Sequence, residues 1–324
     1  MARFEQAASL AARLAVDSVK ERFSPEERLE AIQRVEEEEL GYMPMPDTLE
    51  VKFVNMCREN KVAAVSAVVL AVMSLAIIFA DKLTVYDPNA INLVERLMPP
   101  SRAHWCGTDD LGRDIFTRIL YGGRVSLLVG VIPTTISMAI GIVLGMVSGY
   151  IRQLDAVIMR LADIVLAFPS IVLAMVVMYT LGATTSNIFI ALSMIGWAGT
   201  ARIVRSQTLS LREQEFVEAA RGMGVKKWTI MFRHILPNCL PSLIVLFTLN
   251  IPDAILSEAN LSFLGVGTQP PDSSWGLMVS QSRTFAMSSP WMLIFPSLAI
   301  LIMVLALNFL GDGLRDAVDP HMKK

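Results

Sequence analysis

The sequence is poor in the residues on which catalytic and metal sites depend. Among its 324 residues are only three histidines and three cysteines. The cysteines stand far apart, at positions 57, 106 and 239, which fits neither a disulfide framework nor a zinc-finger pattern. We find no nucleophile with a base at a spacing typical of covalent catalysis. The sequence therefore predicts neither an enzyme nor a metal-binding protein.

Charged residues are also scarce. They make up 18% of the chain, against about 25% in soluble domains, while hydrophobic residues reach 53%. The formal net charge of -2 offers no basic surface for a nucleic acid. No G-x-x-x-x-G-K-[ST] phosphate-binding loop is present, so we expect this chain to bind no ATP and no other cofactor.

The apolar residues that replace them are grouped in long runs. The first 23 residues lack the long apolar core and cleavage site of a secretory signal, so we expect the first run to stay in the membrane. A spanning helix takes about 20 mostly apolar residues. Six segments approach this length: residues 62–80, 126–150, 156–181, 187–204, 240–263 and 291–310. The sequence thus predicts an all-α polytopic protein in contact with membrane lipid.

The orientation follows from the lysines and arginines near the ends of the spans, which favour the cytoplasm. Residues 202–234 hold seven of them, whereas residues 182–186 and 265–290 hold only Arg283. Residues 81–124 hold six and argue the other way, but this loop is long and also acidic, and the rule applies best to short loops. We expect residues 202–234 and both termini to lie in the cytoplasm.

Residues 1–61 differ from the rest and are predicted to form a cytoplasmic, helical extension to the membrane domain of residues 62–324. Ser24 is a candidate N-cap, with Pro25 at the first helical position and Glu27 completing a capping box. Such an extension is either a regulatory contact or a solvated appendage.

The segment EFVEAARGMGVKKWTIMFRHILPN, residues 215–238, interrupts two apolar runs and is called the elbow below. It is predicted to contain a short helix over residues 215–221, a turn at Gly222 and Gly224, and a second helix over residues 226–235. Trp228, Phe232 and Ile235 are expected on one face of this second helix. Proline at position 237 is expected to stop it before the next span. From composition alone, an ordinary interhelical loop is an equally good interpretation.

The elbow resembles the EAA loop of binding-protein-dependent ABC transporter permeases in Glu218, Ala219, Ala220, Gly224, Leu236 and Pro237. At His234 it departs from the aliphatic residue usual in that family. Further blocks resemble the dipeptide/oligopeptide group, in particular its C-type permease: residues 107–130 (with GTDDLGRD), 163–170, 212–224, 232–238, 257–276 and 308–320. The resemblance covers about residues 85–320 and does not extend to the first 60.

The resemblance implies the fold of a type I ABC importer transmembrane domain, with a core at about residues 122–313, in a bacterial inner membrane. In the family, this loop carries a coupling helix that fits a cleft on the ATP-binding subunit. A second, homologous permease, two ATPase subunits that use ATP and Mg, and an extracytoplasmic solute-binding protein would be its partners. Peptides would be the substrate; nickel, glutathione or another small solute are alternatives. A stand-alone secondary transporter is the alternative outside the family.

Three other groups of residues deserve a functional or structural interpretation. Gly141, Gly145 and Gly149 form a GxxxGxxxG ridge, which predicts close helix packing either within the chain or against the partner permease.

Ionisable residues inside a membrane are costly and mark pathways or buried hydrogen bonds. Arg160 and Asp163 are spaced to pair with each other, and Asp253 and Glu258 either line a pathway or serve structure. His104, Cys106, Asp109 and Asp110 suggest a metal cluster only weakly, since both aspartates belong to the GTDDLGRD block.

Overall fold

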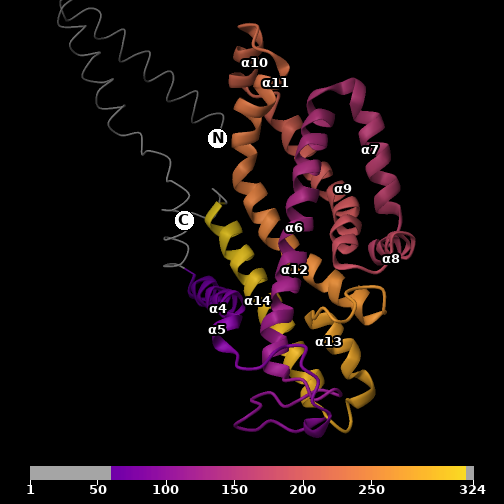
Figure 1. Ribbon diagram of the computed structural model, residues 1–324. Helices are drawn as coiled ribbons and strands as arrows, with labels where there is room; N and C mark the ends of the chain where they lie inside the picture. Colours follow the sequence, from indigo (N-terminus) through magenta and orange to yellow (C-terminus); the bar gives the residue numbers. More distant parts are fainter. Residues whose placement is uncertain (1–59, 319–324) are drawn as a thin grey trace, which may run out of the picture. The chain divides into compact units, whose positions relative to one another are not determined.

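The computed structural model describes residues 60–318, which form helices joined by loops (Figure 1). The chain divides into the units Met1–Lys52 and Phe53–Lys324, and all described residues belong to the second. The predicted N-terminal helices and the capping box at Ser24 lie outside the described residues. Within residues 60–318 the elements are α4 (Lys61–Ile78), α5 (Ala80–Leu83), η1 (Leu93–Glu95), α6 (Ile115–Tyr150), α7 (Arg152–Ala167), α8 (Ser170–Leu181), α9 (Thr185–Leu211), α10 (Glu215–Gly222), α11 (Lys227–Thr229), η2 (Ile230–Ile235), α12 (Leu236–Phe263), α13 (Trp275–Ser282), η3 (Arg283–Phe285) and α14 (Trp291–Val318).

The predicted membrane spans are confirmed as helices, with changes at their ends. Five helical stretches in the described residues are long and apolar enough to cross a membrane, or six if the bent pair α7–α8 forms one span. The second span begins at Ile115 rather than near residue 126, because the Asp114 carboxylate caps the helix by accepting from the Thr117 amide. The last continues to Val318, beyond the predicted residue 310.

The third predicted span is broken rather than straight. α7 and α8 meet at an angle of 90° at Phe168-Pro169. Proline excludes the helical conformation at the residue before it, and Phe168 accordingly has extended backbone angles, φ -95° and ψ 143°.

The fifth span corrects the expectation for proline 237. Proline 237 does not interrupt the helix: it is the second residue of α12, and the wider π-turn before it accommodates the proline ring and its missing amide hydrogen. The irregularity lies just before it, where residues 230–235 form a π-helix, and the stretch Lys227–Phe263 continues as one candidate span. Pro252 also lies inside α12.

The α6–α9 pair is the most extensive helix packing in the described part of the chain. The glycine ridge of α6 faces α9, so the ridge lies at a contact within this chain. A Cβ at Gly145 would lie 2.6 Å from the Ala201 carbonyl oxygen and 2.7 Å from Cβ of Val204. Gly141 and Gly149 approach Thr200 and Thr208 as closely, so only glycine permits this distance between the helices.

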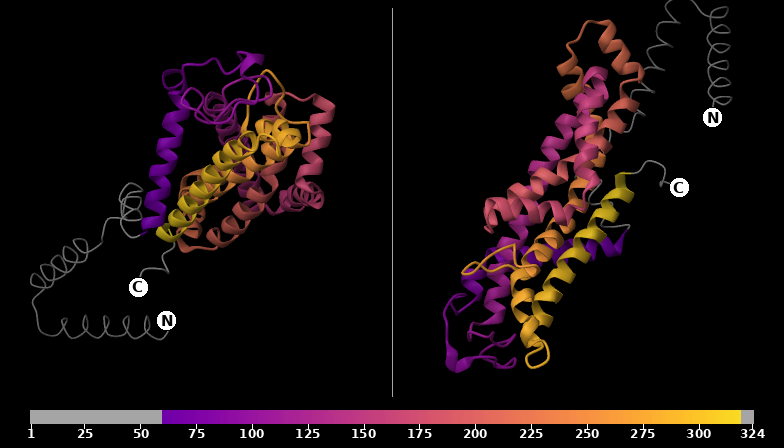
Figure 2. Two further views of the ribbon diagram at one scale, coloured as in Figure 1. Left: turned by 90° about the horizontal axis from the view of Figure 1, so that it is seen from below. Right: turned by 90° about the vertical axis from the view of Figure 1, so that its right-hand side faces the viewer.

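The described residues place two different regions at opposite ends of the long helix α6. α10 and α11 lie at one end, and the loop of residues 84–114 lies at the other, next to the start of α14 (Figure 1). The same separation is seen after a quarter turn, in the right-hand view of Figure 2. The elbow and this loop are therefore on opposite sides of the helical layer.

Candidate functional site

The elbow is anchored to the membrane helices by one face of α10. Val217 is fully buried and Ala220 is 2% exposed, and both pack with Met146 of α6 and Val204 of α9. The Arg221 guanidinium lies over the Tyr150 ring, 5.8 Å from its centroid. A displacement of α10 must therefore also move the packed ends of α6 and α9.

The opposite face of the elbow is open. Glu218 and Ala219 are exposed on α10, and Met223 in the turn is 77% exposed. Trp228 and Phe232 are also exposed, and their rings stack with centroids 6.1 Å apart. The expectation that Ile235 shares their face is wrong: Ile235 is fully buried, because the wider π-turn changes the residue spacing on which that alignment depended.

The turn of the elbow depends on Gly224. Its φ of +76° is favourable only for glycine, and nothing lies within 4 Å of the place where a Cβ would stand. The Gly224 amide donates to the Arg221 carbonyl and the Val225 amide donates to the Ala220 carbonyl, which is a Schellman C-cap for α10. Gly222 is the last residue of α10 and makes no turn itself, contrary to expectation.

After the turn the chain returns through α11 and η2 to α12, which begins at Leu236. Leu236 is half-buried against the core cluster that also holds Val217, whereas Pro237 is exposed. His234 is half-buried, and its backbone carbonyl accepts a hydrogen bond from the side-chain Nδ2 of Asn238 at 2.6 Å. The six residues on which the resemblance depends thus all lie in one compact feature.

The charges within the spans pair differently from the sequence prediction. Asp163 accepts from Arg202 of α9 at 2.8 Å rather than pairing with Arg160, which is exposed. The sequence analysis missed a stronger contact between the same helices, in which both Asp155 oxygens accept from Arg205, with 2.6 Å between Nη2 and Oδ2. Opposite charges at the ends of neighbouring apolar segments were the signal available for this pair.

Glu258 and Asp253, five residues apart on α12, have different surroundings. Glu258 is fully buried, and its Oε1 accepts from Ser262, Thr268 and Ser274 at 2.6, 3.1 and 2.7 Å. This carboxyl group ties α12 to the loop that leads into α13. Asp253 is exposed and borders a cavity of about 290 Å³ between α6, α8, α9 and α12.

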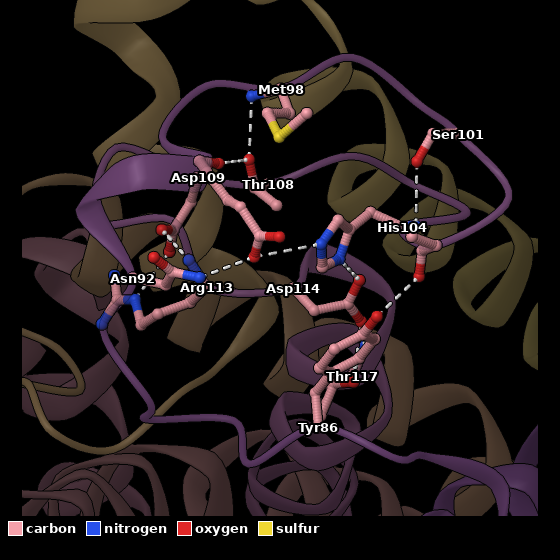
Figure 3. A network of polar contacts seen from close by, with 12 residues as sticks. Tyr86, Asn92, Met98, Ser101, His104, Thr108, Asp109, Arg113, Asp114 and Thr117 are labelled. Carbon is pink, nitrogen blue, oxygen red and sulfur yellow. Dashed lines mark hydrogen bonds and ion pairs between the residues drawn. The ribbon is translucent and has the colours of Figure 1, made fainter.

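The GTDDLGRD block forms a network of polar contacts at the other end of the molecule (Figure 3). Asp109 accepts from the side chain of Arg113 at 2.7 Å and lies 3.6 Å from Arg118. Asp114 lies 2.9 Å from Nδ1 of His104. These acidic groups therefore serve ion pairs and a helix cap, and no group of three or more potential metal ligands occurs among the described residues.

Comparison with known proteins agrees with this arrangement. Residues 138–324 match the family described as binding-protein-dependent transport system inner membrane component. Residues 53–100 match the N-terminal TM domain of oligopeptide transport permease C. Both matches fall on the membrane unit, and neither covers the first 52 residues.

Individual relatives align with most of the chain. It is 47% identical to the dipeptide transport system permease protein DppC of Alkalihalophilus pseudofirmus, over 82% of this chain and 88% of the relative. It is 45% identical to the glutathione transport system permease protein GsiD of Pectobacterium atrosepticum, over 80% and 87% of the two chains. It is 42% identical to the oligopeptide transport system permease protein OppC of Bacillus subtilis, over 82% and 88%. The chain belongs to the binding-protein-dependent transport system inner membrane component family and is a multi-pass permease subunit of an ABC importer.

Proposed function

We propose that this permease imports peptides, together with a second, homologous permease, two ATPase subunits that consume ATP and Mg, and an extracytoplasmic solute-binding protein. The peptide substrate is supported by the names of the relatives DppC and OppC. The observation that carries the mechanism is the elbow, which is anchored by Val217 and Ala220 while Glu218 and Trp228 face outward.

The ATPase subunits dock on the exposed face of the elbow. Stacked aromatic rings beside charged side chains are typical of interface hot spots. Closure of the ATPase pair on ATP would pull α10, and the contact of Val217 with the α6–α9 pair would carry this movement into the spans as a rigid-body motion. The result would be alternating access to the cavity beside Asp253.

The elbow and both termini face the cytoplasm of a bacterium, with the chain in the plasma (inner) membrane. The basic residues of residues 81–124 had argued against this orientation. Three of them are paired with carboxylates: Arg113 and Arg118 with Asp109, and Arg124 with Asp81 at 2.9 Å. The Arg124 guanidinium, and secondarily the Tyr121 hydroxyl, hold the pKa of Asp81 below its usual value, so this pair stays charged at neutral pH. Half of the basic side chains of residues 81–124 are thus engaged within the chain. Because this loop is also long, the lysines and arginines of residues 202–234 are the better guide and support a cytoplasmic elbow.

The docking is tested by the Glu218→Lys variant, produced together with the partner subunits. Glu218 is exposed in the first turn of α10, so the substitution should leave the fold intact but reverse a charge at the interface. We expect at least tenfold weaker co-purification of the ATPase subunits and a parallel loss of peptide uptake. The Asp272→Lys variant makes the same charge change in the loop before α13 and should retain the ATPase. Normal ATPase recovery and uptake with Glu218→Lys would refute the proposal.

A second substrate is favoured by the 45% identity to a glutathione permease. Glutathione is itself a small peptide, so both substrates fit one type of cavity. Uptake of labelled dipeptide and of labelled glutathione by the same assembled complex would separate them. Transport of either solute by the purified chain alone, without ATPase, would instead indicate a secondary transporter.

A further inference from the structure

The cavity between α6, α8, α9 and α12 carries a single formal charge. Its lining is mainly apolar, with small polar side chains contributed by Thr134 and Ser137 of α6, Ser170 of α8, Thr200 of α9, and Asn250 and Ser257 of α12. Asp253 is the one ionisable residue among the lining residues, all of which lie in the described part of the chain. The volume of about 290 Å³ is at the lower end of the range for small-molecule pockets, about 300–1,000 Å³.

The Asp253 carboxylate forms no contact that stabilises the fold. Other carboxylates of the membrane helices, Asp155, Asp163 and Glu258, accept hydrogen bonds from the chain itself, but no described residue donates to Asp253 or pairs with it. It also points from the middle of a long membrane span, where an unpaired charge is unfavourable. A residue in this position needs water or a cationic partner from outside the chain.

A second polar group, in the wall of the cavity, is also unpartnered, although its oxygen is buried. Thr200 is 3% exposed and borders the cavity, and its Oγ1 has no hydrogen-bond partner among the described residues. Asn250 and Ser257 stand one turn before and one turn after Asp253 on α12, so their side chains share its face. The site therefore offers one negative charge with two neutral hydrogen-bonding side chains, Asn250 and Ser257, on the same face of α12.

We propose that Asp253 is a specificity-determining residue that binds the protonated amino group of the peptide as it passes through the cavity. A free peptide carries an ammonium group at its N-terminus, with a pKa of about 8. A charge-assisted hydrogen bond from this ammonium group would compensate the negative charge of Asp253. The neutral hydroxyl groups and Asn250 would form hydrogen bonds with the amide and carbonyl groups of the peptide backbone. This inference rests on the proposed import of peptides and adds the chemical group that is recognised inside the membrane.

The test uses the whole transporter, reconstituted in vesicles with its partner permease, ATPase subunits and binding protein, and a labelled dipeptide. The measured quantity is the number of peptides transported per ATP hydrolysed, which corrects for how well the binding protein delivers its ligand. Asp253→Asn should lower this ratio about tenfold without changing the assembly of the complex, and Asp253→Glu should restore most of it. Asp312→Asn removes an exposed charge from α14, outside the cavity, and should have no effect.

A pH series separates recognition of an ammonium group from a merely structural role. Between pH 7 and pH 9 the peptide loses its N-terminal proton, so the transport ratio of the natural protein should fall severalfold, whereas that of Asp253→Asn should stay constant. Equal ratios for the natural protein and Asp253→Asn would overturn the inference. So would a dependence of the natural protein on external Na⁺ or K⁺ that Asp253→Asn abolishes, since this would make an inorganic cation the partner. If the natural complex transports no peptide at all, the proposed function fails instead.

Discussion

The two ends of the described part of this permease use their charged residues in opposite ways. In the loop of residues 84–114 and the start of α6, one group of charged side chains is buried and paired within the chain, although Asp87, Arg96 and Arg102 are exposed. The buried group is His104, Asp109, Arg113, Asp114 and Arg118, all at most 6% exposed. In the elbow, charged side chains are exposed: Glu215, Glu218, Arg221, Lys226 and Lys227. The buried group finds its partners within the chain, whereas the charged groups of the elbow are exposed and available for the proposed docking of the ATPase subunits.

This difference indicates that the two regions have different roles, one in stability and the other in association. A buried ion-pair network is rigid but sensitive, since the loss of one partner leaves another charge without compensation. The exposed, stacked rings of Trp228 and Phe232 contribute little to folding, and in the proposed docking they would contribute to binding. Substitutions in the loop should therefore change stability, and substitutions in the elbow should change association with the ATPase.

The largest effect is expected from Asp109→Ala. This carboxylate accepts from the side chain and the amide of Arg113 and lies near Arg118, so its removal leaves two buried guanidinium groups without a counter-charge. We expect the free energy of unfolding to fall by about 3–5 kcal/mol, measured by denaturant titration in detergent. The neighbouring Asp110 is only partly buried and forms no side-chain hydrogen bond or ion pair among the described residues, so Asp110→Ala should cost at most about 0.5 kcal/mol. Equal losses in both variants would show that the network is not what stabilises this end.

The second-largest effect is expected in the reactivity of Cys106, which lies in the loop of residues 84–114. Burial, and secondarily the negative charge of Asp114, raise the pKa of the Cys106 thiol to about 11. Because the thiolate is the reactive form, alkylation of Cys106 at pH 7–8 should be about 100-fold slower than for an ordinary thiol of pKa 9, and should increase as the pH approaches 11. Mass mapping of peptides after iodoacetamide treatment distinguishes Cys106 from the other two cysteines. Rapid labelling of Cys106 at pH 7 in the folded protein would show that this end is open.

The sequence allowed the fold and the elbow to be predicted but not the details on which their geometry depends. Long apolar runs identified the spans because a membrane requires about 20 such residues, whatever their partners. The break at Phe168-Pro169 was visible as a proline, but its angle of 90° depends on packing between α7, α8 and α9. The π-helix of residues 230–235 left no sequence signal, and it moved Ile235 into the core.

Pairing between distant residues was the least predictable property of the candidate site. Arg160 is close to Asp163 in sequence, yet Asp163 binds Arg202, thirty-nine positions away. Likewise, the sequence treated Asp253 and Glu258 alike, because both are acidic residues on one apolar helix. Only their neighbours in space distinguish a carboxyl group held by three hydroxyls from one that faces a cavity.

The smallest effect is expected in the elbow itself, from Gly224→Ala. An alanine at φ +76° is unfavourable by about 1 kcal/mol, although no neighbouring atom obstructs its Cβ. We therefore expect unchanged global stability, severalfold faster hydrogen exchange of the α10 amides, and reduced ATPase stimulation by loaded binding protein. Gly222→Ala provides a matched control, since Gly222 is helical and its surroundings are equally open, so the same added methyl group should slow exchange slightly. Equal exchange rates in the two variants would mean that the left-handed turn does not hold α10 in place, and that the elbow owes its shape to the burial of Val217 and Ala220 alone.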